Sequence, residues 1–226
     1  MSDMVDEGMD SHNIEYKAEL VRKGIHLTSL SIPVIYYFIE RDLALSILVP
    51  ITFAFFIVDL LRYYHAPTAR LFYTLFGFML RKHEQDGNNK RLNGATNVLI
   101  AATLCIILFP KLIVITAFTI LIVSDTFAAL IGRKFGRRKF LQKSVEGSLA
   151  FFICSLLVVA VTPKVEYAAT EYLIGAIAAI VGTIVEAGSW QVDDNLSIPF
   201  SVGIVMWGLY WLLYPSVNLF SISMAR

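Results

Sequence analysis

The stretch LIVITAFTILIVSDTFAALIG, residues 112–132, contains a single charged residue, Asp125, and it decides the class of the fold. A transmembrane helix needs about 20 consecutive apolar residues, so this run predicts a helix that crosses a membrane. The whole chain agrees, because 57% of its 226 residues are hydrophobic, 16% are charged and the mean hydropathy is +0.65. Soluble domains have about 25% charged residues. The composition therefore excludes a disordered chain, a disulfide scaffold and an ordinary water-soluble enzyme.

Further apolar segments accompany this one and predict an all-α, polytopic membrane bundle of about seven transmembrane helices. The segments are 24–39, 43–61, 94–109, 112–132, 147–162, 172–187 and 196–214. Residues 69–82 are aromatic-rich and basic at both ends, which predicts a cytoplasmic interfacial helix or, equally well, a re-entrant or buried one. Residues 1–13 are acidic and lack the features of a secretory signal. We expect them to be a disordered tail before one membrane-embedded domain over 14–226.

The basic residues lie mostly on one side of the predicted membrane. With seven spans, 15 of the 19 Lys and Arg residues fall on the side of the N-terminus, and Arg41, Lys111, Lys164 and Arg226 fall on the other. Cytoplasmic loops of membrane proteins are enriched in Lys and Arg. We therefore expect a multi-pass protein with a cytoplasmic N-terminus, in the plasma membrane if the chain is prokaryotic.

Polar residues gather in four clusters at the predicted cytoplasmic ends of the helices. The first cluster has spacings of three and four, which place its members on one helical face. It consists of Glu19, Arg22, Lys23 and His26. A basic anchor at the membrane surface explains the two cations but neither Glu19 nor His26. The second cluster, Asn93 to Asn97 with Thr96, predicts a helix N-terminus, whose amides either only cap the helix or also hold an anion.

The third cluster, SDTFAALIGRKFGRRKFLQKSVEGSLAFF over residues 124–152, carries the strongest signal. A carboxylate at the depth of Asp125 costs about 2.5–3.5 kcal/mol to insert, so it indicates a functional site. Ser124, Ala128 and Gly132 recur every four residues and predict a face for close helix packing. The loop that follows is strongly basic, and Ser144 is expected to begin the next helix. Its cations are Arg133, Lys134, Arg137, Arg138, Lys139 and Lys143, with Gly136 among them.

The composition of this loop is typical of a polyphosphate site. Cations and exposed backbone amides bind phosphate oxygens, and a phosphate-bound magnesium ion uses one or two carboxylates. Asp125 and Glu146 are the candidates for that role. A loop that merely fixes topology would explain the cations but not these two acids. The chain has no GxxxxGK[ST] sequence, so a P-loop mechanism is excluded.

The fourth cluster follows the sixth predicted span and contains no Lys or Arg. Its members are Glu186, Asp193, Asp194 and Asn195, with Pro199 after them. It predicts either a second acidic site, which holds a metal or accepts a hydroxyl proton, or a solvated acidic turn. Glu186 follows Gly175 and Gly182 along one helical face, so we expect it to point into the bundle.

These residues resemble a known family. DTFAALIGRKFGRRKF (125–140) and KSVEGSLAFF (143–152) are similar to the core motif of the CTP-dependent lipid kinases, which include dolichol kinase, phytol kinase and CTP-dependent diacylglycerol kinase. The resemblance extends to ELVRKGIH (19–26), NGATN (93–97) and EAGSWQVDDNLSIPF (186–200). The related phosphatidate cytidylyltransferases share the core, but a later histidine–glycine–glycine and aspartate–arginine signature is expected of them. This chain has no histidine after His83, which favours the kinases.

The resemblance implies magnesium-dependent transfer of the terminal phosphate of CTP to the hydroxyl of a membrane lipid alcohol, at the cytoplasmic face, by a single catalytic domain. The lipid would be a polyprenol, phytol or diacylglycerol. Asp125 and Glu146 would be essential and bind the metal, and Lys143 and Gly132–Lys139 would bind the nucleotide. Asp193 or Asp194 would orient or deprotonate the hydroxyl, with Glu186 as second choice. The rest of the predicted binding set is Arg22, Lys23, His26, Asn93, Thr96, Ser144 and Asn195.

Two other functions stay open at this point. A cytidylyltransferase of the phosphatidate type would attack the alpha phosphate of the nucleotide and release pyrophosphate. A lipid or ion transporter would use Asp125 as a gate without a nucleotide, but its polar groups should reach both sides of the membrane, whereas all four clusters lie on one. We expect no nucleic-acid partner.

Overall fold

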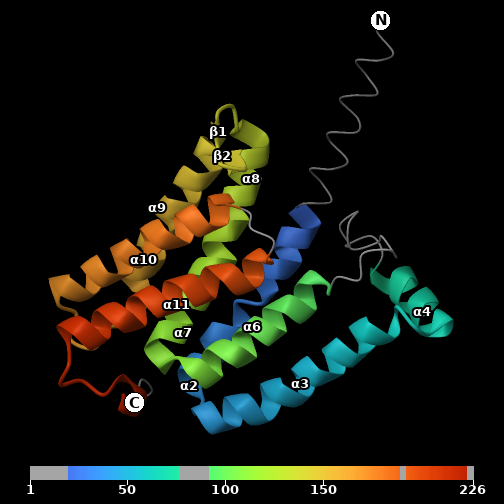
Figure 1. The fold of residues 1–226 in the computed structure, drawn as a ribbon, viewed down its shortest axis with the longest axis horizontal. Helices are drawn as coiled ribbons and strands as arrows, with labels where there is room; N and C mark the ends of the chain where they lie inside the picture. The colour runs from blue at the N-terminus through green and yellow to red at the C-terminus, as the bar shows by residue number, and fades with distance from the viewer. Residues whose placement is uncertain (1–19, 77–91, 189–191, 223–226) are drawn as a thin grey trace, which may run out of the picture.

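The computed structural model describes residues 20–76, 92–188 and 192–222, and these form a bundle of helices (Figure 1). Residues 20–28 are helical and are called helix 20–28 below. The later elements are α2 (Ser31–Phe38), α3 (Arg41–Leu61), α4 (Ala66–Phe76), α6 (Gly94–Leu108), α7 (Lys111–Thr119), η2 (Ile120–Ser124), α8 (Asp125–Phe135), β1 (Lys139–Phe140), β2 (Lys143–Ser144), α9 (Val145–Val161), α10 (Ala169–Gly188), α11 (Asp194–Leu213) and η3 (Leu219–Ser221). The all-α prediction is confirmed, apart from the short antiparallel pair β1–β2.

Four helices of the described residues are long and apolar enough to cross a membrane. They are Arg41–Leu61, Lys111–Phe135, Ala169–Gly188 and Asp194–Leu213, and the second of them runs through α7, η2 and α8. α6 and α9 coincide with predicted spans but have only 15 and 17 residues. These apolar helices suggest a membrane protein. The predicted tail, residues 1–13, and residues 77–82 of the predicted interfacial helix lie outside the described residues, and α4 forms the first part of that helix.

The first predicted span, 24–39, is not one helix. Helix 20–28 ends in a turn at residues 29 and 30, where the N–H groups of Ser29 and Leu30 bond to the carbonyls three residues earlier. Pro33 explains the break. In a continuous helix its ring would clash with the carbonyl of Ser29, and it has no N–H to donate. Helix 20–28 is therefore set at its own angle to α2, which begins at Ser31.

The long helix Lys111–Phe135 forms the centre of the bundle, because 78% of its most apolar window is buried. α9 and α11 pack on this long helix, and α10 packs on both α9 and α11 (Figure 1). α3 lies at the edge of the bundle, where it packs on α6, and only 11% of its window is buried. Its many exposed apolar side chains suit contact with lipid.

Small residues bring α8 and α9 close together, as the spacing of Ser124, Ala128 and Gly132 predicts. A Cβ on Gly147 would lie 3.0 Å from the carbonyl oxygen of Ala128 and 3.2 Å from the Cα of Gly132. About two turns further along α9, Ser155 Oγ donates to Ser124 Oγ of η2 at 3.0 Å. The predicted packing face is thus confirmed, and it fixes the position of α8 relative to the loop that precedes α9.

Cations at the end of the bundle opposite the clustered acids bind backbone carbonyls. Arg41 Nε donates to the carbonyl of Ile106 at 3.0 Å, and Lys111 Nζ donates to the carbonyl of Ile39 at 2.9 Å. Lys164 Nζ donates to the carbonyls of Val159 and Thr162 at 2.6 and 2.7 Å. Carbonyls at helix C-termini lack partners within their helix and carry partial negative charge. These cations therefore stabilise the ends of α6, α2 and α9.

Candidate functional site

Residues from six parts of the chain line one cavity of about 490 Å³. Its polar lining comes from helix 20–28, from the start of α6, from the start of α8 and from the start of α11. These residues are Arg22, Lys23, His26, Asn93, Asp125, Asp193, Asp194 and Asn195. The volume lies within the range of about 300–1,000 Å³ that is typical of small-molecule sites. The first, second and fourth polar clusters thus meet at Asp125.

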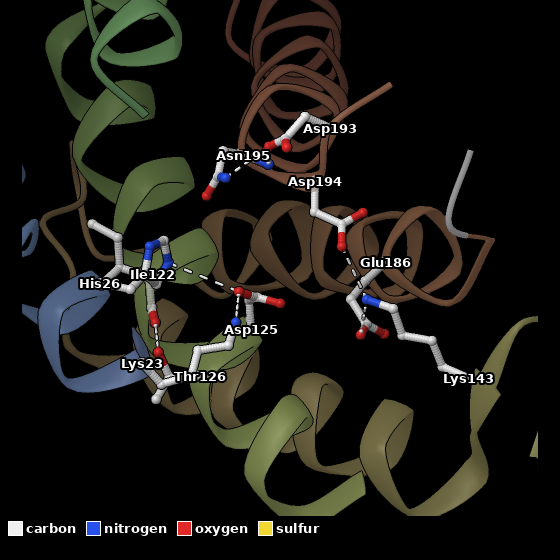
Figure 2. A network of polar contacts seen from close by, with 10 residues as sticks. All are labelled: Lys23, His26, Ile122, Asp125, Thr126, Lys143, Glu186, Asp193, Asp194 and Asn195. Carbon is white, nitrogen blue, oxygen red and sulfur yellow. Dashed lines mark hydrogen bonds and ion pairs between the residues drawn. The ribbon is translucent and has the colours of Figure 1, made fainter. Parts of the chain in front are cut away.

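Asp125 lines this cavity and lies beside Lys23 and His26 (Figure 2). Its residue is only 7% exposed, and Lys23, which is 5% exposed, donates to its Oδ2 atom. The Nε2 atom of His26 lies 3.8 Å from the same oxygen. Burial of a carboxylate is unfavourable unless it is paired. The ammonium of Lys23 supplies that partner. The Lys23–Asp125 pair therefore joins helix 20–28 to α8.

A turn of π-helix, η2, comes directly before Asp125. Such turns are rare and occur often at functional sites, because the extra residue changes which side chains face a given direction. The side chain of Thr126 donates to the carbonyl of Ile122 at 2.6 Å across this junction. The α-helical spacing used for the sequence prediction does not anticipate η2, and no signal in the sequence indicates it.

Lys143 joins the basic loop to the acidic cluster. Figure 2 shows the side chain of Lys143, from strand β2, in contact with Glu186 and Asp194. Its Nζ atom lies 2.7 Å from Oε1 of Glu186 and 3.1 Å from Oδ2 of Asp194. Burial acts to lower the pKa of Lys143, but the charges of Asp194 and Glu186 outweigh it and hold that pKa above its ordinary value. Lys143 therefore carries its charge at every physiological pH. Glu186 is 1% exposed, which confirms that it points into the bundle.

The start of α11 is organised by Asp193. Its Oδ1 atom accepts hydrogen bonds from the backbone N–H of Asn195 at 2.9 Å and from the side-chain amide of Asn195 at 2.7 Å. Asp193 is thus the N-cap of the helix. Since Asp193 caps the helix, Asp194 is left to face Lys143. The interpretation of this cluster as a solvated acidic turn is wrong, because its side chains are at least partly buried and engaged.

Glu146 lies in the first turn of α9, next to the basic loop. Its carboxylate accepts the backbone N–H of Arg137 at 3.0 Å and more weakly that of Arg138 at 3.5 Å, so it orders the basic loop. It does not line the cavity. Within the described residues, no group of three or more His, Cys, Asp or Glu side chains is arranged to hold a metal ion. The predicted pairing of Asp125 and Glu146 at a metal therefore stays a prediction.

The glycines of the basic loop pack against Ser144. A Cβ on Gly136 would lie 2.8 Å from Ser144 Oγ and 2.2 Å from the carbonyl oxygen of Gly132. Ser144 in turn accepts the N–H of Gly147 at 3.1 Å and is the N-cap of α9, as predicted. Arg133 and Lys134 in the last turn of α8 are exposed, and so are the loop cations Arg137, Arg138 and Lys139. This compact turn therefore presents its positive charge to solvent.

The predicted helix start at Asn93 is also confirmed. Asn93 is the N-cap of α6, and its Oδ1 atom accepts the N–H of Thr96 at 2.9 Å. Asn93 and Gly94 line the cavity, whereas Thr96 is fully buried and does not. Thr96 is thus packed inside the bundle and does not face the cavity.

A buried ion pair holds Asn93, and the sequence analysis missed it. Nε of Arg62 lies 2.8 Å from Oδ1 of Asp59, with both side chains 0% exposed, and Oδ2 of Asp59 accepts the N–H of Asn93 at 2.7 Å. The end of α3 thereby fixes the start of α6. The available signal was an acid and an arginine three residues apart at the end of an apolar segment, a spacing at which side chains meet on a helix.

Comparison with known proteins gives two relatives. The chain is 32% identical over 189 residues to Uncharacterized protein RP860 of Rickettsia prowazekii, a match that covers 83% of this chain and 92% of the relative. The chain belongs to the family of that protein. It is also 28% identical over 155 residues to CTP-dependent diacylglycerol kinase 1 of Schizosaccharomyces pombe, covering 62% of this chain and 69% of the relative. No family model matches the chain, and no solved structure gives a significant match.

Proposed function

We propose that this chain is a lipid kinase that transfers the terminal phosphate of CTP to the hydroxyl of a membrane lipid alcohol. The observation that carries the proposal is the cavity in which buried Asp125 meets the acidic start of α11, with Lys143 connecting that acidic cluster to an exposed basic loop. The distant relationship to a CTP-dependent diacylglycerol kinase supports a general lipid kinase function and a nucleotide donor.

The charge of the cavity favours an alcohol over a phosphorylated lipid. Three carboxylates line it, Asp125, Asp193 and Asp194, against the two cations Arg22 and Lys23, which leaves a net charge of −1 with His26 neutral. A phosphate monoester carries a charge of about −1.5 to −2 and would be repelled. A hydroxyl is uncharged and finds carboxylate acceptors. Before a metal ion binds, this balance suits an uncharged hydroxyl better than a phosphate monoester, which supports a kinase rather than a phosphatidate cytidylyltransferase.

Phosphoryl transfer depends mainly on positioning and on neutralisation of charge. The exposed cations of the basic loop are suited to the nucleotide phosphates, with Lys143 nearest to the acidic cluster. In the proposed reaction the lipid oxygen forms a bond to the terminal phosphorus, the bond to the bridging oxygen breaks, and CDP leaves. Asp194 or Asp193 accepts the hydroxyl proton.

Magnesium fits part of this donor set. The ion binds phosphate oxygens and one or two carboxylates, and Asp125 with an aspartate from the start of α11 offers such a pair within one cavity. Glu146, the second ligand that the sequence predicts, would have to release the backbone of the basic loop first. The ion would supply neutralisation of the charge on the nucleotide phosphates.

The same proposal includes the topology. Seven spans with a cytoplasmic N-terminus put the basic loop and the cavity on the side where the nucleotide is available, and the excess of Lys and Arg on that side supports this orientation. The apolar helices of the described residues support embedding in a membrane.

The test is a transfer assay with purified protein, a panel of lipid alcohols and CTP labelled at either the alpha or the gamma phosphate. We expect gamma label in the lipid. Alpha label in the lipid would identify a cytidylyltransferase, and no label with any lipid would refute an enzyme of either kind. Asp125→Asn should reduce transfer to background, whereas Asp42→Asn, an exposed acid at the far end of α3, should retain it. Near-normal activity of Asp125→Asn would overturn the assigned site.

A further inference from the structure

We propose that the hydrocarbon chain of the lipid substrate enters the cavity sideways from the bilayer, between helix 20–28 and α3. This inference rests on the proposed function, because it takes a lipid alcohol as the substrate. It assigns the apolar side of the cavity as the binding surface for the part of the chain next to the hydroxyl. The residues of this apolar wall are Ile25, Ala54, Phe55, Val58, Phe72 and Val98.

The cavity has two chemically different walls. The polar wall holds Asp125 with its partner Lys23 and the start of α11, and the apolar wall is formed by helix 20–28, α3, α4 and α6. The phosphates and sugar of a nucleotide are polar and would gain little from contact with six apolar side chains. A lipid alcohol is itself divided in this way, with one polar end on a hydrocarbon chain. Burial of that chain against apolar side chains contributes about 25 cal/mol per Å², so the two walls match the two ends of the proposed substrate.

The apolar wall is open on the side where lipid would be. Ile25, Phe55 and Val58 line the cavity and yet keep 39%, 47% and 44% of their surface exposed. They belong to helix 20–28 and to α3, the helix at the edge of the bundle, whose most apolar window is 11% buried. An exposed apolar rim at a peripheral membrane helix connects the cavity to the hydrocarbon layer. A chain can therefore reach Asp125 without passing through water.

A second apolar groove exists among the described residues, and it serves as the alternative to be tested. It lies between α9 and α10, has a volume of about 300 Å³, and is lined by Leu149, Phe152, Ile180 and Ile184 among others. No charged residue lines it. A lipid bound there would have an apolar surface for its chain but neither an acid nor a cation beside its hydroxyl, which is why the wall at α3 is the better site.

Photocrosslinking separates the two surfaces without relying on turnover. The full chain is incubated in micelles with a diacylglycerol that carries a diazirine within one acyl chain, illuminated without nucleotide, and digested for mass spectrometry. We expect label on the peptide that contains Ala54 and Val58, and loss of that label when unlabelled diacylglycerol competes. Label concentrated on Leu149 or Ile184, or label at α3 that unlabelled lipid does not displace, would overturn the proposal.

A filling variant tests the same wall through kinetics. Ala54→Trp adds bulk to the wall of the cavity, whereas Phe53→Trp adds it on the neighbouring residue, which is 62% exposed and does not line the cavity. Ala54→Trp should lower competed crosslinking several-fold and raise the KM for the lipid, with the KM for CTP unchanged; Phe53→Trp should behave as wild type. Equal changes in crosslinking and in the KM for the lipid in the two variants, or a change in the KM for CTP alone, would refute the assignment.

The outcomes also distinguish this inference from the proposed function. Displaceable label at α3 in a protein without transfer activity would refute the kinase and leave the lipid site standing. Transfer activity together with label at the groove between α9 and α10 would support the kinase and refute the lipid site at α3.

Discussion

Replacing Asp59 by asparagine removes one charge from an ion pair whose two side chains are completely buried. Asparagine keeps the shape of the side chain and an oxygen for the N–H of Asn93, so the variant isolates the loss of charge. The guanidinium of Arg62 stays buried but loses the negative charge of Asp59 beside it. Removing one partner of a buried pair costs about 3–5 kcal/mol, because the other charge stays desolvated.

The surroundings of Arg62 place the effect at the lower end of that range. Its guanidinium carbon lies 4.7 Å from the ring centres of both Tyr63 and Phe72, and its Nη2 donates to the hydroxyl of Tyr63 at 2.7 Å. These contacts remain in the variant and keep part of the stabilisation of the cation. We therefore expect a loss of about 3 kcal/mol. For a chain of this size that corresponds to a fall in Tm of about 6–12 °C.

The assay is thermal unfolding of purified protein in one detergent, followed by circular dichroism. Asp42→Asn on the same helix is the control, and since Asp42 is exposed its Tm should stay close to that of wild type. Combining Asp59→Asn with Arg62→Met removes both charges, so the double variant should be more stable than Asp59→Asn alone. An unchanged Tm for Asp59→Asn, or strictly additive losses in the double variant, would refute the reasoning.

Three further predictions concern other contacts. Gly175→Ala puts a Cβ 2.3 Å from Cγ1 of Val159 and should lower stability by about 1–3 kcal/mol in the same unfolding assay, whereas Gly208→Ala, with nothing within 4 Å, should not. Glu171→Gln weakens an acceptor of three backbone N–H groups and should cost about 1.5–3 kcal/mol; an unchanged Tm would contradict it. Lys143→Gln should weaken binding of a fluorescent CTP analogue in a titration, and equal affinity would remove this residue from the nucleotide site.

The positions of the later helices were predictable because long apolar runs determine them. The predicted segments 172–187 and 196–214 correspond to α10 and α11 within a few residues. The helix starts after Asn93 and Ser144 were predictable for a local reason, since each cap involves a side chain and an N–H three residues later. The convergence of most of the candidate residues followed from the placement of polar groups at one side of the spans.

The remaining features depend on how distant segments pack. The Lys143 contact with Asp194 joins residues 51 positions apart, and the Lys23 contact with Asp125 joins residues 102 apart, so no local pattern reports them. The contacts of Glu146 with two backbone N–H groups depend on the fold of the loop, and its role at a metal stays a prediction. Pro33 accounts for the break in the first predicted span. The span was predicted from its run of apolar residues, and that criterion takes no account of a proline.

The cations at the far end of the bundle have a consequence for synthesis of the protein. Arg41 reaches a carbonyl at the end of α6, and Lys111 reaches one at the end of α2, across 65 and 72 positions of the chain. α2 is therefore synthesised long before Lys111, whose side chain binds the carbonyl at its end. A nascent chain that stops short of Lys111 lacks the side chain that binds the carbonyl of Ile39, so this helix end gains its partner only after residue 111 has been made.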